Sequence, residues 1–209
     1  MSSSSRDNIL TKIKAALTKS TRLPFPEINN EAPVYQPLQQ DLVVEFAEQF
    51  TTLLGKFSFC TGPEELLASF NLLVAEQKWT QLYCIDNALK DFLQQKWSDN
   101  IESCEASITG CEALVARTGS ILLSAKDSGR IASVYAPVHL CIAFTSQLKY
   151  DISDALSYVQ KKYDGVIPSF ITLATGPSRT ADIEKTLVVG VHGPKEVYLF
   201  LIDDLTEAS

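Results

Sequence analysis

The feature that most constrains the fold is a nearly continuous apolar run, Val138–Phe144. Such a run is typical of a strand in a parallel sheet that is covered on both faces. Shorter apolar runs at Lys56–Cys60, Leu82–Ile85 and Val197–Ile202 predict further strands, and helical patterns separate several of them. Helices that alternate with short strands predict an α/β fold with a mainly parallel central sheet.

The helical patterns have recognisable ends. Apolar residues at helical spacing run from Leu42 to Leu54 and stop at Gly55, and Pro63 begins a second helix. The other predicted elements are helices over Ala88–Trp97 and Ile152–Tyr163, strands over Ser120–Ser124 and Phe170–Ala174, a short helical stretch over Glu112–Arg117, and a helix or loop over Ile131–Tyr135.

The N-terminal part differs from the rest. Asp7–Lys19 has an apolar helical face, and Leu23–Pro37 carries four prolines, which predicts an extended arm. We therefore expect an amphipathic helix and arm over residues 1–38, followed by an α/β domain over residues 39–209. A helix tethered in this way can pack across a subunit boundary, which favours a homodimer.

Composition excludes several classes of function. The 209 residues carry a net charge of −7, which argues against nucleic acid or an anionic membrane as partner. The five cysteines are scattered and form no C-x-x-C pair, and the two histidines have no ligand-spaced neighbours, so we predict no metal and no cofactor. No signal peptide or membrane-spanning run is visible, which favours the cytoplasm.

A polar segment near the C-terminus is the first candidate site. It follows the strand Phe170–Ala174 and precedes an apolar-periodic stretch, Ile183–Val191, that predicts a helix. Ligands of parallel sheets lie outside the carboxyl ends of strands, and helix N-termini attract anions. We therefore expect a small anion here, either a carboxylate (a small anionic organic acid) or a phosphate; alternatively, Ser178 or Thr180 is only a helix cap and Arg179 a surface charge. The predicted ligand-binding residues of this segment are Gly176, Ser178, Arg179, Thr180 and Gly193.

Three titratable residues near this segment are candidates for acid–base catalysis. Asp182 and Glu184 fall in the first turn of the predicted helix, where the helix dipole alone would also favour carboxylates. His192 lies before Gly193 in a predicted tight turn, where it either transfers protons or only completes the turn.

Two Thr-Gly pairs bracket the predicted short helix. Thr109, Gly110 and Gly119 would let the backbone approach a ligand closely, or would only satisfy turn geometry. The sequence does not distinguish these alternatives, and we include all three as candidate ligand-binding residues.

Longer stretches of the C-terminal half carry a further signal. They are ITGCEALVARTGS (Ile108–Ser120), APVHLCIAF (Ala136–Phe144) and GPSRTADIEKTLVVGVHGP (Gly176–Pro194). Together they resemble the lactate-utilization protein C family, also called the LUD-domain family.

The resemblance implies both a fold and a setting. The fold would be a three-layer α/β/α domain related to the NagB/RpiA/CoA-transferase group, formed by residues 39–209. The protein would be the subunit without a cluster in the oxidation of lactate to pyruvate, beside iron–sulfur partner proteins. An independent isomerase or acyl/CoA-transferase, or a non-catalytic regulatory or scaffold protein, is the alternative.

One residue departs from the family pattern. The resemblance implies an acidic residue in the A-E-T-G-like string, where this chain has Arg117 before Thr118-Gly119. Glutamate is the nucleophile of related CoA transferases, and an arginine cannot replace it in that role. The departure weighs against transferase chemistry.

Overall fold

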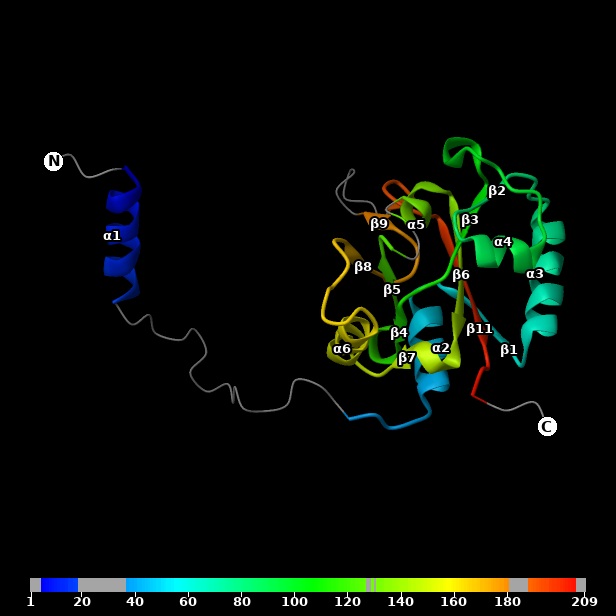
Figure 1. The fold of residues 1–209 in the computed structure, drawn as a ribbon, viewed down its shortest axis with the longest axis horizontal. Coiled ribbons are helices and arrows are strands. Elements are labelled where there is room, and N and C mark those ends of the chain that lie inside the picture. Colours follow the sequence, from blue (N-terminus) through cyan, green and yellow to red (C-terminus); the bar gives the residue numbers. More distant parts are fainter. Residues whose placement is uncertain (1–4, 19–36, 127–128, 130, 181–187, 206–209) are drawn as a thin grey trace. The chain divides into compact units, whose positions relative to one another are not determined.

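The computed structural model describes residues 5–18, 37–126, 129, 131–180 and 188–205 (Figure 1). Contacts between residues divide the chain into two units, Met1–Pro37 and Leu38–Ser209. In the first unit, the predicted N-terminal helix is present as α1 (Ser5–Leu17), and none of its side chains is buried. Nearly all of the predicted proline-rich arm lies outside the described residues.

The second unit is built on a five-stranded parallel sheet. Its strand order is β1-β11-β6-β3-β2, so that the first strand lies at one edge and the second at the other. The longest pairing joins β6 to β11, from Val138 opposite Glu196 to Phe144 opposite Ile202. The strands are β1 (Lys56–Cys60), β2 (Leu82–Cys84), β3 (Ala106–Thr109), β6 (Val138–Phe144) and β11 (Glu196–Ile202).

Two helices cover one face of this sheet (Figure 1). They are α3 (Pro63–Gln77), which begins with a proline in its first turn, and α4 (Asn87–Leu93), which the Asp86 side chain caps. Phe70 of α3 packs edge-on against Phe200 of β11. The two helices exclude water from this face of the sheet. The strand side chains that point toward them are therefore apolar.

The opposite face is covered by helix α2 (Leu42–Thr52) and a second, four-stranded sheet. Phe46 and Phe50 of α2 stack with ring centroids 5.4 Å apart and are fully buried. Helix α6 (Ile152–Lys162) covers the outer side of the second sheet through Ala155 and Val159 (Figure 1). The second sheet has the order β7-β4-β5-β8, with β4 (Ala113–Val115), β5 (Ser120–Ser124), β7 (Leu148–Lys149) and β8 (Ile171–Ala174).

The α/β class with a mainly parallel central sheet is confirmed, and the second sheet is an addition that the sequence analysis did not contain. The short elements that complete the described chain are the 3₁₀ turns η1 (Ile101–Ser103), η2 (Ala116–Thr118) and η3 (Thr145–Gln147), helix α5 (Ala132–Tyr135), and strands β9 (Arg179–Thr180) and β10 (Val188–Val189).

Two predicted helices are wrong in part. Glu112–Arg117 contains strand β4, which pairs antiparallel with β5, and a 3₁₀ turn at its end. Helix α4 stops at Leu93 instead of Trp97, because Gln94 adopts a left-handed conformation and Trp97 forms a bridge with Leu82. In both places pairing with another extended segment overrides the helical pattern.

Candidate functional site

Five of the predicted site residues line one cavity of about 290 Å³, which we call the loop cavity. They are Gly176, Ser178, Arg179, His192 and Gly193. Two separate segments of the chain therefore meet around a single hollow that is large enough for a small molecule.

Backbone hydrogen bonds hold the two segments together. The Ser178 amide donates to the Pro194 carbonyl over 2.9 Å, and the Gly190 amide donates to the Ser178 carbonyl over 2.8 Å. Strands β9 and β10 add a short antiparallel ladder beside these bonds. These backbone hydrogen bonds therefore fix where Ser178 and Gly193 lie in the loop.

Leu53, which follows the last residue of α2, contacts the loop that contains Gly176 and Arg179. Gly176 has φ +76°, and a Cβ there would lie 2.4 Å from the Leu53 carbonyl oxygen, so that only glycine fits. The same oxygen accepts a hydrogen bond of 2.6 Å from Nη2 of Arg179. Unpaired carbonyls at a helix C-terminus are natural acceptors for arginine, which explains this contact.

The contact with Leu53 leaves Arg179 suited to bind an anion. A guanidinium has five N–H donors in one plane, and the bond to Leu53 uses one of them. The side chain is exposed and lines the loop cavity. Anchoring one nitrogen restricts the orientation of the group, which lowers the entropic cost of binding a carboxylate.

The loop cavity does not lie where the sequence predicted. Strand β8, which leads into the loop, pairs antiparallel with β5 in the second sheet. Val134 and Pro194, which line the cavity, shortly precede β6 and β11. The cavity is therefore near the amino ends of these parallel strands, and the expected position at the carboxyl end of a parallel strand is wrong.

The helix predicted over Ile183–Val191 is also wrong at its described end. Val188 and Val189 form β10, opposite Thr180 and Arg179 of β9. β-branched residues favour strands, and the hydrogen-bonding partner is close along the chain. Asp182 and Glu184, the predicted carboxylate catalysts, lie outside the described residues.

A larger cavity, about 410 Å³, lies at the carboxyl ends of the parallel strands. We call it the carboxyl-end cavity. Gly110, which follows β3, lines it together with Phe144 and Ile202 at the ends of β6 and β11. One predicted ligand-binding residue thus belongs to a different cavity from the four that line the loop cavity.

Thr109, the residue before Gly110, is buried and contacts His139. The Thr109 hydroxyl is 2.8 Å from Nε2 of His139, and neither side chain is more than 1% exposed. Burial lowers the pKa of His139 to about 4, so the ring is neutral at pH 7. Within the described part of the chain, no hydrogen-bond partner faces its Nδ1.

Gly119 is explained by packing. Its φ is +58°, and a Cβ would lie 2.5 Å from the Phe50 amide nitrogen in α2.

We expect Gly119→Ala to lower the free energy of unfolding by about 2 kcal/mol, because the added methyl group strains the turn and pushes α2 away. Urea denaturation of the variant and the unaltered protein measures this difference in the free energy of unfolding. Gly62→Ala, where a Cβ meets nothing within 4 Å, is the control and should change stability far less.

Arg117, which stands where the resemblance implies an acidic residue, forms an ion pair with Asp151. Its Nε and Nη2 donate to the two carboxylate oxygens over 2.9 and 3.2 Å. This bond to Arg117 lowers the pKa of Asp151, whose carboxylate also caps α6 through the Ile152 amide. The arginine therefore ties the turn after β4 to α6.

The sequence analysis missed a buried carboxylate, Glu112. It is fully buried and accepts hydrogen bonds from Lys162 (2.7 Å), Tyr163 (2.8 Å) and Ser124. Burial alone would raise the pKa of Glu112, but the bonds from Lys162, Ser124 and Tyr163 together hold that pKa below its ordinary value. A glutamate within the apolar run Cys111–Val115 was the available signal.

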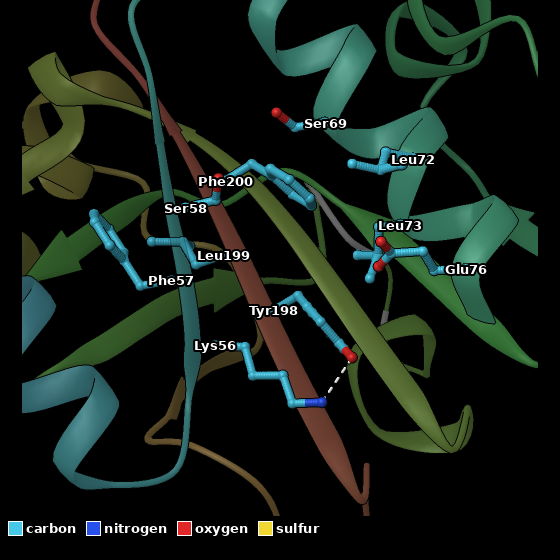
Figure 2. A pocket seen from close by; sticks show the side chains of 10 residues that line it. All are labelled: Lys56, Phe57, Ser58, Ser69, Leu72, Leu73, Glu76, Tyr198, Leu199 and Phe200. Carbon is cyan, nitrogen blue, oxygen red and sulfur yellow. Dashed lines mark hydrogen bonds between the residues drawn. The ribbon is translucent and has the colours of Figure 1, made fainter.

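A third hollow, of about 250 Å³, lies between α3 and strands β1 and β11 (Figure 2). Lys56 Nζ donates to the Tyr198 hydroxyl and to Glu196, both over 2.7 Å. Its charge is thus neutralised within the protein, and none of the predicted site residues lines this hollow. We do not assign anion binding to it.

Comparison with known proteins identifies the family. Residues 42–202 match the LUD domain model. The chain belongs to the LUD domain family. It is 34% identical over 190 residues to lactate utilization protein C of Anoxybacillus flavithermus, covering 81% of this chain and 85% of that protein.

Other similarities are shorter or weaker. Lactate utilization protein C of Bacillus licheniformis is 38% identical over 112 residues, covering 51% of this chain and 47% of that protein. The chain thus spans about half the length of that relative. A crystal structure of a DUF162 family protein from Deinococcus radiodurans superposes with a TM-score of 0.57 at 17% identity, covering 79% of this chain and 99% of that one, and shows the same fold.

Two features are absent from the described residues. No helix among them is long and apolar enough to cross a membrane. In the same part of the chain, no three His, Cys, Asp or Glu side chains come together as a metal site would require. All five cysteines are buried, and none forms a disulfide.

Proposed function

We propose that this LUD domain protein binds a small carboxylate, such as lactate or pyruvate, in the loop cavity and serves the oxidation of lactate to pyruvate. The observation that carries the proposal is the meeting of Gly176–Arg179 with His192–Gly193 around one hollow. The similarity to lactate utilization protein C supports the choice of organic acid. Iron–sulfur partner proteins would carry the redox centres, and this chain would be the subunit without a cluster.

The residues of the loop cavity suit a 2-hydroxy or 2-oxo acid. Arg179 can hold the carboxylate through paired N–H donors, which is the strongest neutral-pH contact that a side chain offers this group. Ser178 adds a hydroxyl beside it, and exposed His192 is the proposed proton acceptor for the substrate hydroxyl. Asp182 and Glu184 remain candidate carboxylates in the adjoining segment.

The structure gives no support to a CoA-transferase mechanism. Arg117 replaces the acidic residue of the family pattern, and its guanidinium is paired with Asp151. An arginine cannot attack a thioester at neutral pH. Binding and orientation of a free acid is therefore the function that fits these residues better.

We expect Arg179→Gln to weaken binding of lactate and pyruvate by roughly 10- to 100-fold. The variant loses a charge-assisted hydrogen-bond pair worth about 1.5–3 kcal/mol. Isothermal titration calorimetry measures the affinity, and growth on lactate of a strain carrying the variant measures the biological effect.

Lys161→Gln is the matched control, because it removes one exposed positive charge from α6, away from the lining of the loop cavity. It should bind lactate like the unaltered protein. If Arg179→Gln also binds normally, the carboxylate is held elsewhere. If the unaltered protein binds neither acid, the proposed function is wrong.

A further inference from the structure

The carboxyl-end cavity has no part in the proposed function, yet it has the position expected of a ligand site. Its lining includes Phe144 and Ile202 at the ends of β6 and β11, Gly110 after β3, and the first turns of α3 at Pro63 and α4 at Ala88. Ligands of open parallel sheets bind outside the carboxyl ends of the strands. A volume of about 410 Å³ falls within the range of roughly 300–1,000 Å³ typical of small-molecule sites.

The walls of the cavity are mostly apolar. Two aromatic rings, Phe92 on α4 and Phe144 at the end of β6, contribute to them. Phe144 is 40% exposed although it ends a strand whose other residues are buried. An apolar occupant would remove this ring from water, which is favourable. The aliphatic lining residues are Leu66, Leu89, Ile142 and Ile202.

Both charged side chains in the lining already have partners in the protein. Lys162 pairs with buried Glu112 over 2.7 Å. Asp86 accepts from the amides of Ala88 and Leu89 at the start of α4, over 2.8 and 3.3 Å. An anionic ligand would lose its hydration here without an uncompensated positive charge to replace it. The lining therefore selects against anions.

The polar wall of the cavity is preformed. Gln147 donates from Nε2 to the Cys111 carbonyl over 2.6 Å and accepts at Oε1 from the Phe144 amide over 2.8 Å. These bonds fix the loop after β3 against the end of β6. A rigid, mostly apolar hollow with few polar groups suits a planar molecule with little charge.

We propose that the carboxyl-end cavity binds an uncharged aromatic molecule of one or two fused rings. The rings lie between the apolar side chains of α3 and α4 and the ends of β6 and β11. This site is distinct from the loop cavity, which lies near the amino ends of the same strands. The protein thus has one cavity suited to a small acid and a second suited to a neutral ring.

Indole is the probe for this proposal. Titration of the full-length protein with indole, followed by ligand-observed NMR, is expected to show saturable binding. Indole-3-carboxylate has the same rings and a negative charge, and it should bind at least tenfold more weakly. Ala88→Trp, which fills the cavity from an exposed position on α4, should weaken indole binding at least tenfold.

Matched variants separate this site from other surfaces. Asp91→Trp adds the same side chain to α4 outside the lining and should leave indole binding unchanged. Phe92→Ala, which removes one aromatic wall, is a second variant that should weaken it. Arg179→Gln should have no effect, so that a failure of carboxylate binding alone removes the proposed function and leaves this inference in place.

Three results would overturn the inference. They are the absence of saturable indole binding to the unaltered protein, equal binding of indole to the Ala88→Trp variant, and tighter binding of indole-3-carboxylate than of indole. The first would show that the cavity does not accept a ring. The second would place the ring elsewhere, and the third would show that an anion is preferred.

Discussion

Replacing Lys162 with methionine is expected to lower the free energy of unfolding by about 3 kcal/mol at pH 7. The change leaves the carboxylate of Glu112, which is fully buried, without its ionic partner. Breaking a buried ion pair by removing one member costs roughly 3–5 kcal/mol, and the lower end applies because the Lys162 side chain is 36% exposed. Urea denaturation of the variant and the unaltered protein measures the difference.

Glu112→Gln is the informative comparison. The amide keeps the shape of the side chain and can still accept from Ser124 and Tyr163, while Lys162 can turn toward water. We therefore expect a smaller loss, about 1–2 kcal/mol. An equal loss in both variants would mean that the network matters as packing and not as a charge pair.

The pH dependence provides a second check. In the unaltered protein the pKa of Glu112 is lowered, so its contribution to stability is present above the ordinary carboxyl pKa and is lost as pH falls through the lowered value. In the Lys162→Met variant burial dominates and raises that pKa. The stability difference between the two proteins should therefore shrink as pH falls from 7 to 4.

Four of the five strands of the parallel sheet could be predicted because each is a local apolar run, whereas β3 (Ala106–Thr109) was not predicted. Val138–Phe144 is apolar on both faces, and helices of ordinary length separate β1 from β2 and β2 from β3. The second sheet was not predicted as a sheet, although strands over Ser120–Ser124 and Phe170–Ala174 were. Its strand β4 spans only three residues, and an apolar segment of that length fits a helix as well as a strand.

The candidate sites show the same difference between residues that are close along the chain and residues that only the fold brings together. Gly176, Ser178 and His192 are close along the chain, so a short antiparallel ladder suffices to bring them to one cavity. The carboxyl-end cavity depends instead on the strand order, which places residues 63 and 202 side by side. Likewise, Lys162 and Glu112 are 50 residues apart, and no local pattern pairs them.

Acid should destabilise this protein in a way that depends on His139. Its pKa falls from 6.5 to about 4 because the ring is completely buried. The folded state thus binds fewer protons than the unfolded chain between these two values. Stability from this group is fully present above pH 6.5 and is lost as pH falls toward 4, by about 3 kcal/mol in total at about 1.4 kcal/mol per pKa unit.

The test compares how steeply the free energy of unfolding changes with pH in the unaltered protein and in the His139→Gln variant. The carboxylates contribute equally to both, so they do not affect the difference. Between pH 7 and pH 4, the unaltered protein should lose about 3 kcal/mol more than His139→Gln, in which the titrating ring is absent. A His139→Gln variant with the original slope would mean that His139 can become charged without unfolding, for example by turning its Nδ1 toward water. The neutral ring would then not be a requirement of the fold, and the polar contact with Thr109 would be the part that matters.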